Sequence, residues 1–354
     1  MKTSLKTVIG LTTVATLGAV ILSAHSSVAA STKEVKNLKI SFIPSKNPSD
    51  ITTATQGLDT LLISELKKQG YKVDKVDMTT GTDYNAVGKA LDAGTVDVGY
   101  GVSGGTYAAY ASGAKVILTA TRKGLNNDDL KNKKNATNPQ YWNNHKPTTQ
   151  TKDEVTSYRG LIIAGNTSVG KQLADYVKKG KKIPVSLIKK AKWGLSSTTS
   201  ASGYLYPSEW LTKNYKISVR DLPSAVTGLD YGTATADLAS GQVDIIAGYA
   251  DLRMDFANAW TTTDKATDTI WNQTNVIGVT DEIYNDGILV SKNSDNLKKY
   301  PGLAKALQNA IIAMSKTDQG KKIIAVYSHD GYEKSSEANY KPFFKVLQDV
   351  AAEN

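Results

Sequence analysis

A pattern that occurs twice in the chain constrains the fold more than any other feature. The first copy spans residues 83–98 and the second spans 230–245, and both carry Asp-Tyr, Leu, Gly and Val-Asp at an offset of 147 residues. In each copy Asp is suited to cap the start of a helix, and Gly is suited to end it in the left-handed conformation. The Val-Asp pair then enters a buried strand. The repeat therefore predicts two related lobes.

The segments before the first copy indicate the class of these lobes. Residues 38–43 alternate like a strand, residues 51–69 have the apolar spacing of a helix, and residues 72–77 form a second short strand. A strand, a helix and a strand in this order predict a parallel sheet covered by helices. We therefore expect an α/β protein, with each lobe a mainly parallel sheet flanked by helices. Between the two copies, the polar stretch 126–154 has little periodicity and is interpreted as a surface excursion or a flexible loop.

The first 29 residues have the composition of a secretory leader. Lys2 and Lys6 precede a mostly apolar, uncharged stretch, and small residues follow up to Ala29. The leader resembles that of a lipoprotein, but His25 stands where the lipid-bearing cysteine would be. The chain has no cysteine at all, which excludes a thioether lipid anchor, disulfides and thiolate metal sites. We expect an exported protein that is not a lipoprotein.

The net charge of the chain limits the kinds of partner that it can be expected to bind. The formal net charge is +10, so the exported protein is suited to adhere to an anionic wall or membrane surface. The densest lysine runs, 131–134 and 178–182, lack interleaved aromatic residues. Nucleic-acid binding is therefore not expected. Clustered metal-ligating side chains are also missing, so no metal or other cofactor is expected.

The stretch 196–207 is the strongest candidate for a binding site. It contains hydroxyl residues up to Ser200, then Ala201, Ser202 and Gly203, and a helix is expected to start there because Pro207 suits only a first turn. A helix N-terminus offers free N–H groups and a partial positive charge. We therefore expect this segment to hold an anion without help from a lysine or arginine.

This stretch resembles the phosphonate, phosphite and phosphate substrate-binding proteins of ABC transporters. The likeness rests on Trp193-Gly194, on Ser200-Ala201-Ser202-Gly203-Tyr204 with Pro207, and on the first repeat copy. Weaker matches are Ser103-Gly104-Gly105-Thr106-Tyr107, Tyr158-Arg159 and Ile283-Tyr284-Asn285-Asp286. The likeness extends from about 38 to 347, without the stretch 126–154.

The resemblance implies a two-lobed type II periplasmic-binding-protein fold with a ligand cleft between the lobes. We place lobe 1 at 30–124 and 281–354, and lobe 2 at 125–280. The expected partners are a small oxyanion and a membrane permease, and the protein is expected to be a monomer at the cell surface or outside the cell.

The resemblance also implies site residues. Tyr84 and Tyr107 match positions that reach into the cleft in the family, and the repeat suggests that Tyr231 mirrors Tyr84. Tyr249 and Asp251 follow a strand whose carboxyl end borders the crevice, and Ser45 follows the first strand in the same way. With Ser200, Ala201, Ser202 and Gly203, these residues are the candidate ligand contacts.

Two departures from the family pattern narrow the ligand. Ala201 replaces a threonine, and the neighbourhood of Gly232 lacks the acid that pairs with an aminoalkyl group in some relatives. A small anion or a phosphonate with an uncharged tail is therefore expected, rather than an aminoethyl phosphonate.

Two alternatives remain. In the first, the same fold binds a sulfonate, a nitrate or a vitamin precursor. A secreted serine hydrolase is the other alternative, because Gly101-Val102-Ser103-Gly104-Gly105 matches a nucleophile elbow. It would need Asp251 or Asp286 as the acid and His329 as the base.

Overall fold

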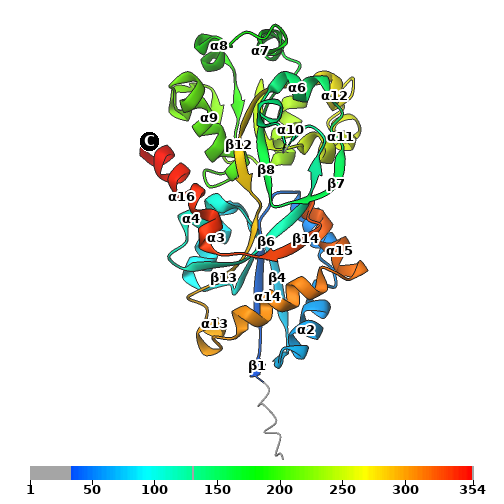
Figure 1. The fold of residues 1–354 in the computed structure, drawn as a ribbon, viewed down its shortest axis with the longest axis vertical. Helices are drawn as coiled ribbons and strands as arrows, with labels where there is room; N and C mark the ends of the chain where they lie inside the picture. Colours follow the sequence, from blue (N-terminus) through cyan, green and yellow to red (C-terminus); the bar gives the residue numbers. More distant parts are fainter. Residues whose placement is uncertain (1–32, 130, 353–354) are drawn as a thin grey trace, which may run out of the picture. The chain divides into compact units, whose positions relative to one another are not determined.

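The computed structural model describes residues 33–129 and 131–352, which form two large β-sheets surrounded by helices (Figure 1). The predicted leader, residues 1–29, lies outside the described residues. Within the part of the chain that the structure describes, no helix is both long enough and apolar enough to cross a membrane.

The larger sheet has the strand order β14-β6-β13-β5-β2-β4, and β7 pairs with β6 beside this path. Strand β2 is parallel to β4 and β5, whereas β13 is antiparallel to both β5 and β6. Its strands are β2 (Leu38–Phe42), β4 (Val76–Thr80), β5 (Val98–Val102), β6 (Ala114–Leu125), β7 (Gln150–Val155), β13 (Gly287–Ser291) and β14 (Gly331–Lys334). Strands β1 (Lys33–Val35) and β3 (Tyr71–Val73) form a separate parallel pair.

The smaller sheet has the order β10-β9-β11-β8-β12, with β9 parallel to its neighbours and β8 antiparallel to β11 and β12. Its strands are β8 (Ser157–Ala164), β9 (Trp193–Gly194), β10 (Ala225–Val226), β11 (Ile245–Tyr249) and β12 (Asn275–Tyr284). Both sheets are thus mixed rather than mainly parallel. In the larger sheet β14 and β7 are also antiparallel to β6. Strands β8 and β13 are each the first strand after the chain passes from one sheet to the other.

Helices cover both sheets. Helices α2 (Leu58–Lys68) and α14 (Leu303–Met314) lie side by side on the larger sheet and share one apolar core with it (Figure 1). A second core joins α4 (Gly104–Ala109) and α16 (Glu337–Ala352) to the smaller sheet. Besides α3 (Tyr84–Ala93), α9 (Tyr206–Tyr215) and α10 (Tyr231–Ser240), further helices are α1 (Pro48–Ala54), α5 (Lys133–Ala136), α6 (Pro139–Asn144), α7 (Ser168–Lys178), α8 (Val185–Lys190), α11 (Leu252–Thr262), α12 (Ile270–Gln273), α13 (Asp295–Lys299) and α15 (Asp318–Ile324).

The repeated pattern folds as predicted in both places. Helix α3 (Tyr84–Ala93) is capped by Asp83, whose side chain accepts a hydrogen bond from the backbone N–H of Ala86, and it ends at Gly94 with φ of 73°. Helix α10 (Tyr231–Ser240) is capped in the same way by Asp230 and ends at Gly241 with φ of 77°. Each helix leads into a buried strand, β5 or β11. One copy lies beside each sheet.

The aspartates of the two Val-Asp pairs also have equivalent partners. Asp97 accepts a hydrogen bond from the backbone N–H of Lys39 at 2.7 Å, and Asp244 accepts one from the backbone N–H of Lys192 at 2.8 Å. Both carboxylates are buried, so each satisfies a backbone donor at the start of a neighbouring parallel strand.

The polar stretch 126–154 is not a flexible loop, so that part of the expectation was wrong, although most of its described residues are exposed or half-buried. It contains α5, α6 and β7, and Trp142 is fully buried with its indole N–H donating to the carbonyl of Ala136 at 2.7 Å. The side chain of Asn143 pairs with both the N–H and the C=O of Val276 on β12, at 2.8 and 2.9 Å. The buried Trp142 and the hydrogen bonds of Asn143 to the edge strand β12 thus hold this segment in place. The segment has too few apolar residues to show a periodicity in the sequence.

Candidate functional site

The segment that begins at Ser200 starts a helix, as predicted. The Ser200 hydroxyl accepts a hydrogen bond from the backbone N–H of Gly203 at 3.3 Å. The first turn, Ala201–Leu205, is π-helical and runs directly into α9 (Tyr206–Tyr215), with Pro207 near the α9 N-terminus. The partial positive charge of this helix start faces the pocket that Ser200 and Ala201 help to line.

That pocket lies between the two sheets and encloses about 360 Å³ of empty space, part of it open to solvent. Side chains from the loop after β2, from the residue after β5 and from β6 line one side of the pocket. Side chains from β8, from β11 and from the helix start after β9 line the other. The lining residues are Ser45, Lys46, Tyr84, Ser103, Arg122, Tyr158, Ser200, Ala201, Ser202, Tyr231, Tyr249, Asp286, Tyr327 and Ser328.

Tyrosine hydroxyls gather at the helix start. The Tyr231 hydroxyl lies 3.1 Å from the hydroxyls of both Ser200 and Ser202. Tyr84, its counterpart in the repeat, lies in the same pocket, and burial raises the pKa of both tyrosines. These phenols therefore keep their protons at neutral pH and can act as donors to an anion.

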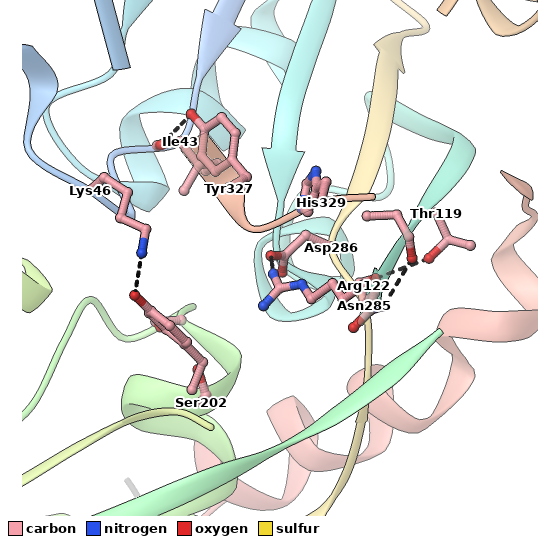
Figure 2. Close-up of polar contacts among 12 residues, drawn as sticks. Ile43, Lys46, Thr119, Arg122, Ser202, Asn285, Asp286, Tyr327 and His329 are labelled. Atoms are coloured by element: carbon pink, nitrogen blue, oxygen red, sulfur yellow. Dashed lines mark hydrogen bonds and ion pairs between the residues drawn. The ribbon is translucent and has the colours of Figure 1, made fainter. Parts of the chain in front are cut away.

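Lys46 enters the pocket from the loop after β2 and contacts the opposite side. Its ammonium donates to the Tyr249 hydroxyl at 2.6 Å and forms an ion pair with Asp255. Figure 2 shows the ammonium pointing toward the part of the molecule that carries Ser202. Burial lowers the pKa of Lys46, and the charge of Asp255 acts against this shift.

A second ion pair lines another side of the pocket. Arg122 donates from Nη2 to Asp286 at 2.6 Å, and both side chains are mostly buried (Figure 2). Burial raises the pKa of Asp286, while the neighbouring guanidinium opposes this rise. Lys46, from the loop after β2, and Arg122, from β6, both line the pocket, although the sequence predicted an anion site without a lysine or arginine. Each of these cations is already paired with a carboxylate.

Seven of the ten predicted contacts line the pocket. They are Ser45, Tyr84, Ser200, Ala201, Ser202, Tyr231 and Tyr249. Gly203 acts indirectly, because a Cβ at this position would come within 2.5 Å of Ser196 Cβ and 3.0 Å of the Tyr231 hydroxyl. Glycine thus lets the helix start approach both neighbours closely.

Tyr107 and Asp251 lie outside this pocket. The Tyr107 hydroxyl donates to Glu337 at 3.3 Å, and its ring packs edge-on against Tyr340. Asp251 accepts from Nε and Nη2 of Arg253 at 2.9 and 2.7 Å, and from Thr148 at 2.6 Å. Tyr107 thus anchors α16, and Asp251 is held in a buried ion pair. The family likeness had suggested ligand contact for Tyr107, and the position after a predicted strand had suggested it for Asp251.

The residues required for a serine hydrolase have other partners. The Ser103 hydroxyl donates to the carbonyl of Thr199 at 2.9 Å and also caps α4. The ring nitrogen Nδ1 of His329 lies 3.0 Å from the Tyr332 hydroxyl. Neither contact forms a serine–histidine pair. Within residues 33–129 and 131–352, no group of three or more histidines and acids is placed to hold a metal ion.

Sequence reasoning missed several residues of the pocket. The missed lining residues are Lys46, Arg122, Tyr158, Asp286, Tyr327 and Ser328. The sequence pointed to two of them, because Tyr158 and Asp286 lie in motifs that resemble those of the family. Lys46 and Arg122 had none, because each is a single basic residue among many in a basic chain.

The comparisons with known proteins agree with this arrangement. Residues 40–340 match the family described as the phosphonate periplasmic substrate-binding protein of ABC transporters. A search of the curated proteins found no match for this sequence.

Solved structures share the fold at low sequence identity. A binding-protein component of an ABC phosphonate transporter from Pseudomonas aeruginosa has a TM-score of 0.61 and 14% identity, over 90% of this chain and 89% of that one. PhnD1 from Prochlorococcus marinus, in complex with methylphosphonate, has a TM-score of 0.61 and 15% identity, over 89% and 98% of the two chains. A Xanthomonas citri protein bound to ATP has a TM-score of 0.61 and 12% identity, over 90% and 99%.

The family match covers well over half of the chain, and the similar structures confirm a two-lobed α/β fold of the periplasmic-binding-protein type. This chain belongs to the phosphonate periplasmic substrate-binding protein family of ABC transporters.

Proposed function

We propose that this protein binds a small phosphonate-type oxyanion in the pocket at Ser200–Ser202 and delivers it to a membrane permease. The observation that carries the proposal is a polar pocket with walls from both sheets, at which a helix start, tyrosine and serine hydroxyls and two cations converge. Such donors bind an anion strongly when water is excluded.

The two ion pairs suit a ligand that can both accept and donate. An incoming oxyanion can accept hydrogen bonds from Arg122 or Lys46. Asp286 then faces the ligand as a carboxylate and needs a donor. A hydrogen phosphonate carries an acidic O–H that can donate to Asp286, whereas a sulfonate carries none. This chemistry favours a phosphonate, a phosphite or a phosphate over a sulfonate.

Lobe closure is the proposed mechanism of capture. Lobe 1 would hold the larger sheet and lobe 2 the smaller one. The first crossover would then lie near Thr156 rather than near residue 125, because β7 pairs with β6 of the larger sheet, and the second near Asn285 rather than 281. Contacts such as Lys46 with Asp255 and Ser103 with Thr199 join the two sides. A ligand that bridges them stabilises the closed state through contacts made only there.

The remaining features of the proposal follow from the family and the charge. The protein acts outside the cytoplasm as a monomer without enzymatic activity, and its basic surface contributes to retention at an anionic wall or membrane.

Calorimetry and thermal melting of the exported protein test this function. The panel contains methylphosphonate, phosphite, phosphate, methanesulfonate and molybdate. At about 100-fold over its dissociation constant, a true ligand adds roughly 2.7 kcal/mol of stability. We expect this effect with one or more of the three phosphorus oxyanions. Stabilisation by methanesulfonate alone would refute the choice of ligand. Ester hydrolysis that Ser103→Ala abolishes would instead establish the hydrolase.

Tyr231→Phe tests the site itself. It removes the hydroxyl that joins Ser200 to Ser202, so the affinity for the oxyanion should fall about five- to tenfold, which corresponds to one hydrogen bond. The control is Tyr215→Phe, since Tyr215 lies on α9 but not in this pocket. Equal losses in the two variants would place the anion elsewhere.

A further inference from the structure

A second cavity adjoins the oxyanion pocket. It encloses about 620 Å³ of empty space, part of it open to solvent, and four residues line both cavities: Arg122, Tyr158, Tyr249 and Ser328. These shared residues form the border between the two spaces. A group bound at the helix start can therefore extend past the two tyrosines into the second cavity.

The second cavity has apolar side chains on opposite walls. Leu125 and Val155 come from β6 and β7, and Ala250 and Met254 come from the end of β11 and the start of α11. The polar stretch 126–154 thus contributes to one wall of the cavity through β7. Apolar walls on both sides favour a ligand group that gains from leaving water.

The charged residues of this cavity are already neutralised. Asp128 pairs with Arg159 at 2.8 Å, and Asp251 pairs with Arg253 at 2.7 Å. Lys123 pairs with Asp330 at 2.9 Å. The two remaining charges, Arg122 and Asp255, belong to the ion pairs of the oxyanion pocket.

A charged tail would therefore find no unpaired partner here. An ammonium group in this cavity would have to compete with a cation for a carboxylate or stay partly desolvated, and both are unfavourable. Burial also raises the pKa of Asp128, which is consistent with a partly dry space. An uncharged tail meets none of these costs.

We propose that the cargo is a phosphonate with an uncharged organic substituent of several carbons, which occupies this second cavity. The inference rests on the proposed function, because it uses the oxyanion at Ser200–Ser202 as its anchor. It goes further by assigning the substituent a place and a chemistry.

Calorimetry with a ligand series tests the substituent. The series contains phosphite, methylphosphonate, n-butylphosphonate and 4-aminobutylphosphonate. Each buried methylene is worth up to about fourfold in affinity, so butylphosphonate should bind at least tenfold more tightly than methylphosphonate. The aminobutyl compound should bind more weakly than the butyl compound. Butylphosphonate binding no better than methylphosphonate, or aminobutylphosphonate binding best, would overturn the inference.

A filling substitution locates the substituent. Met254→Trp places a larger side chain in the second cavity, so the advantage of butylphosphonate over methylphosphonate should disappear. The matched control is Asn258→Trp, an exposed position on the same helix, which should keep the advantage. Melting curves of both variants check that they fold. A Met254→Trp variant that keeps the full advantage would contradict the placement.

The two proposals fail in different ways. If neither phosphate nor any of the four compounds binds the folded protein, the proposed function fails and this inference falls with it. If phosphite and methylphosphonate bind while the longer compounds do not, the function stands and only the substituent cavity is refuted.

Discussion

At the scale of single residues, burial decides which groups can respond to pH. His329 is 4% exposed, and its Nε2 has no hydrogen-bond partner among the described residues. Burial holds the pKa of His329 well below its usual value of 6.5, and the charges of Arg122 and Lys46 add to this effect. The folded protein therefore keeps this imidazole neutral at a pH where the unfolded chain protonates it.

His329 should make the folded state sensitive to mild acid. Because the folded-state pKa is depressed, the stability is fully present above pH 6.5 and is lost as the pH falls below it. The loss should reach about 2 kcal/mol between pH 7 and pH 5, from the shift of one proton. Urea denaturation at both pH values, for the wild type and for His329→Gln, measures it.

The comparison of these two proteins isolates the histidine. Carboxylates titrate in both, so only the difference between the two pH dependences counts. The wild type should lose more stability than His329→Gln. An equal loss in the two proteins would show that His329 takes up its proton in the folded state.

The residue scale also shows what sequence reasoning could find. The hydroxyl run at Ser200, the capping Asp83 and the paired Tyr84 and Tyr231 are local patterns, and local patterns report local structure. Lys46 contacts Asp255, which is 209 positions away, and no local pattern marks such a pair. The helix start and three of the five tyrosines that line the pocket were therefore within reach of sequence reasoning, and the two cations were not.

At the scale of elements, the polar stretch 126–154 stabilises an edge of the smaller sheet. Strand β12 is an edge strand of that sheet, and edge strands leave backbone groups unpaired. Asn143 on α6 satisfies both the N–H and the C=O of Val276 on this edge. This role could not be predicted from the composition of 126–154, because one amide side chain makes the hydrogen bonds that a neighbouring strand would otherwise make.

Asn143→Ala should loosen the β12 edge. The substitution leaves a backbone donor and a backbone acceptor without their partner, at a cost of about 1–3 kcal/mol. Hydrogen exchange of the Val276 amide should become roughly 10- to 100-fold faster, as this free energy implies. Asn144→Ala, at the exposed neighbouring position, is the control. Unchanged protection of Val276 in Asn143→Ala would show that the clamp is not needed.

At the scale of the whole molecule, the two sheets meet through a few close contacts. The Ser103 hydroxyl reaches the Thr199 carbonyl at 2.9 Å, and Tyr206 packs edge-on against Phe343. The fold class and the two-lobed plan were predictable from the repeat, because one copy serves each lobe. The close contact between Ser103 and Thr199 was not predictable, because it depends on where α4 (Gly104–Ala109) meets the segment before α9.

Gly105 is the residue on which this close contact depends. A Cβ at Gly105 would lie 2.5 Å from the carbonyl oxygen of Thr199 and would also clash with the Leu205 side chain. A leucine side chain can move aside, but a backbone carbonyl cannot move without shifting its segment. Gly105 is helical and has no left-handed φ, so alanine is compatible with α4 itself. The added methyl group therefore penalises the closed arrangement more than it penalises either lobe.

Gly105→Ala should therefore weaken ligand binding by opposing closure. A penalty of about 1.4 kcal/mol on the closed state reduces the apparent affinity tenfold, and we expect a loss of at least this size for methylphosphonate. Small-angle X-ray scattering should show the wild type contracting with ligand and the variant contracting less. Gly331→Ala is the control, since its nearest neighbour, Thr121 Oγ1 at 3.2 Å, belongs to the same sheet. Wild-type affinity and full contraction in Gly105→Ala would mean that capture does not require the α4 contact, and closure would then have to be driven elsewhere between the lobes.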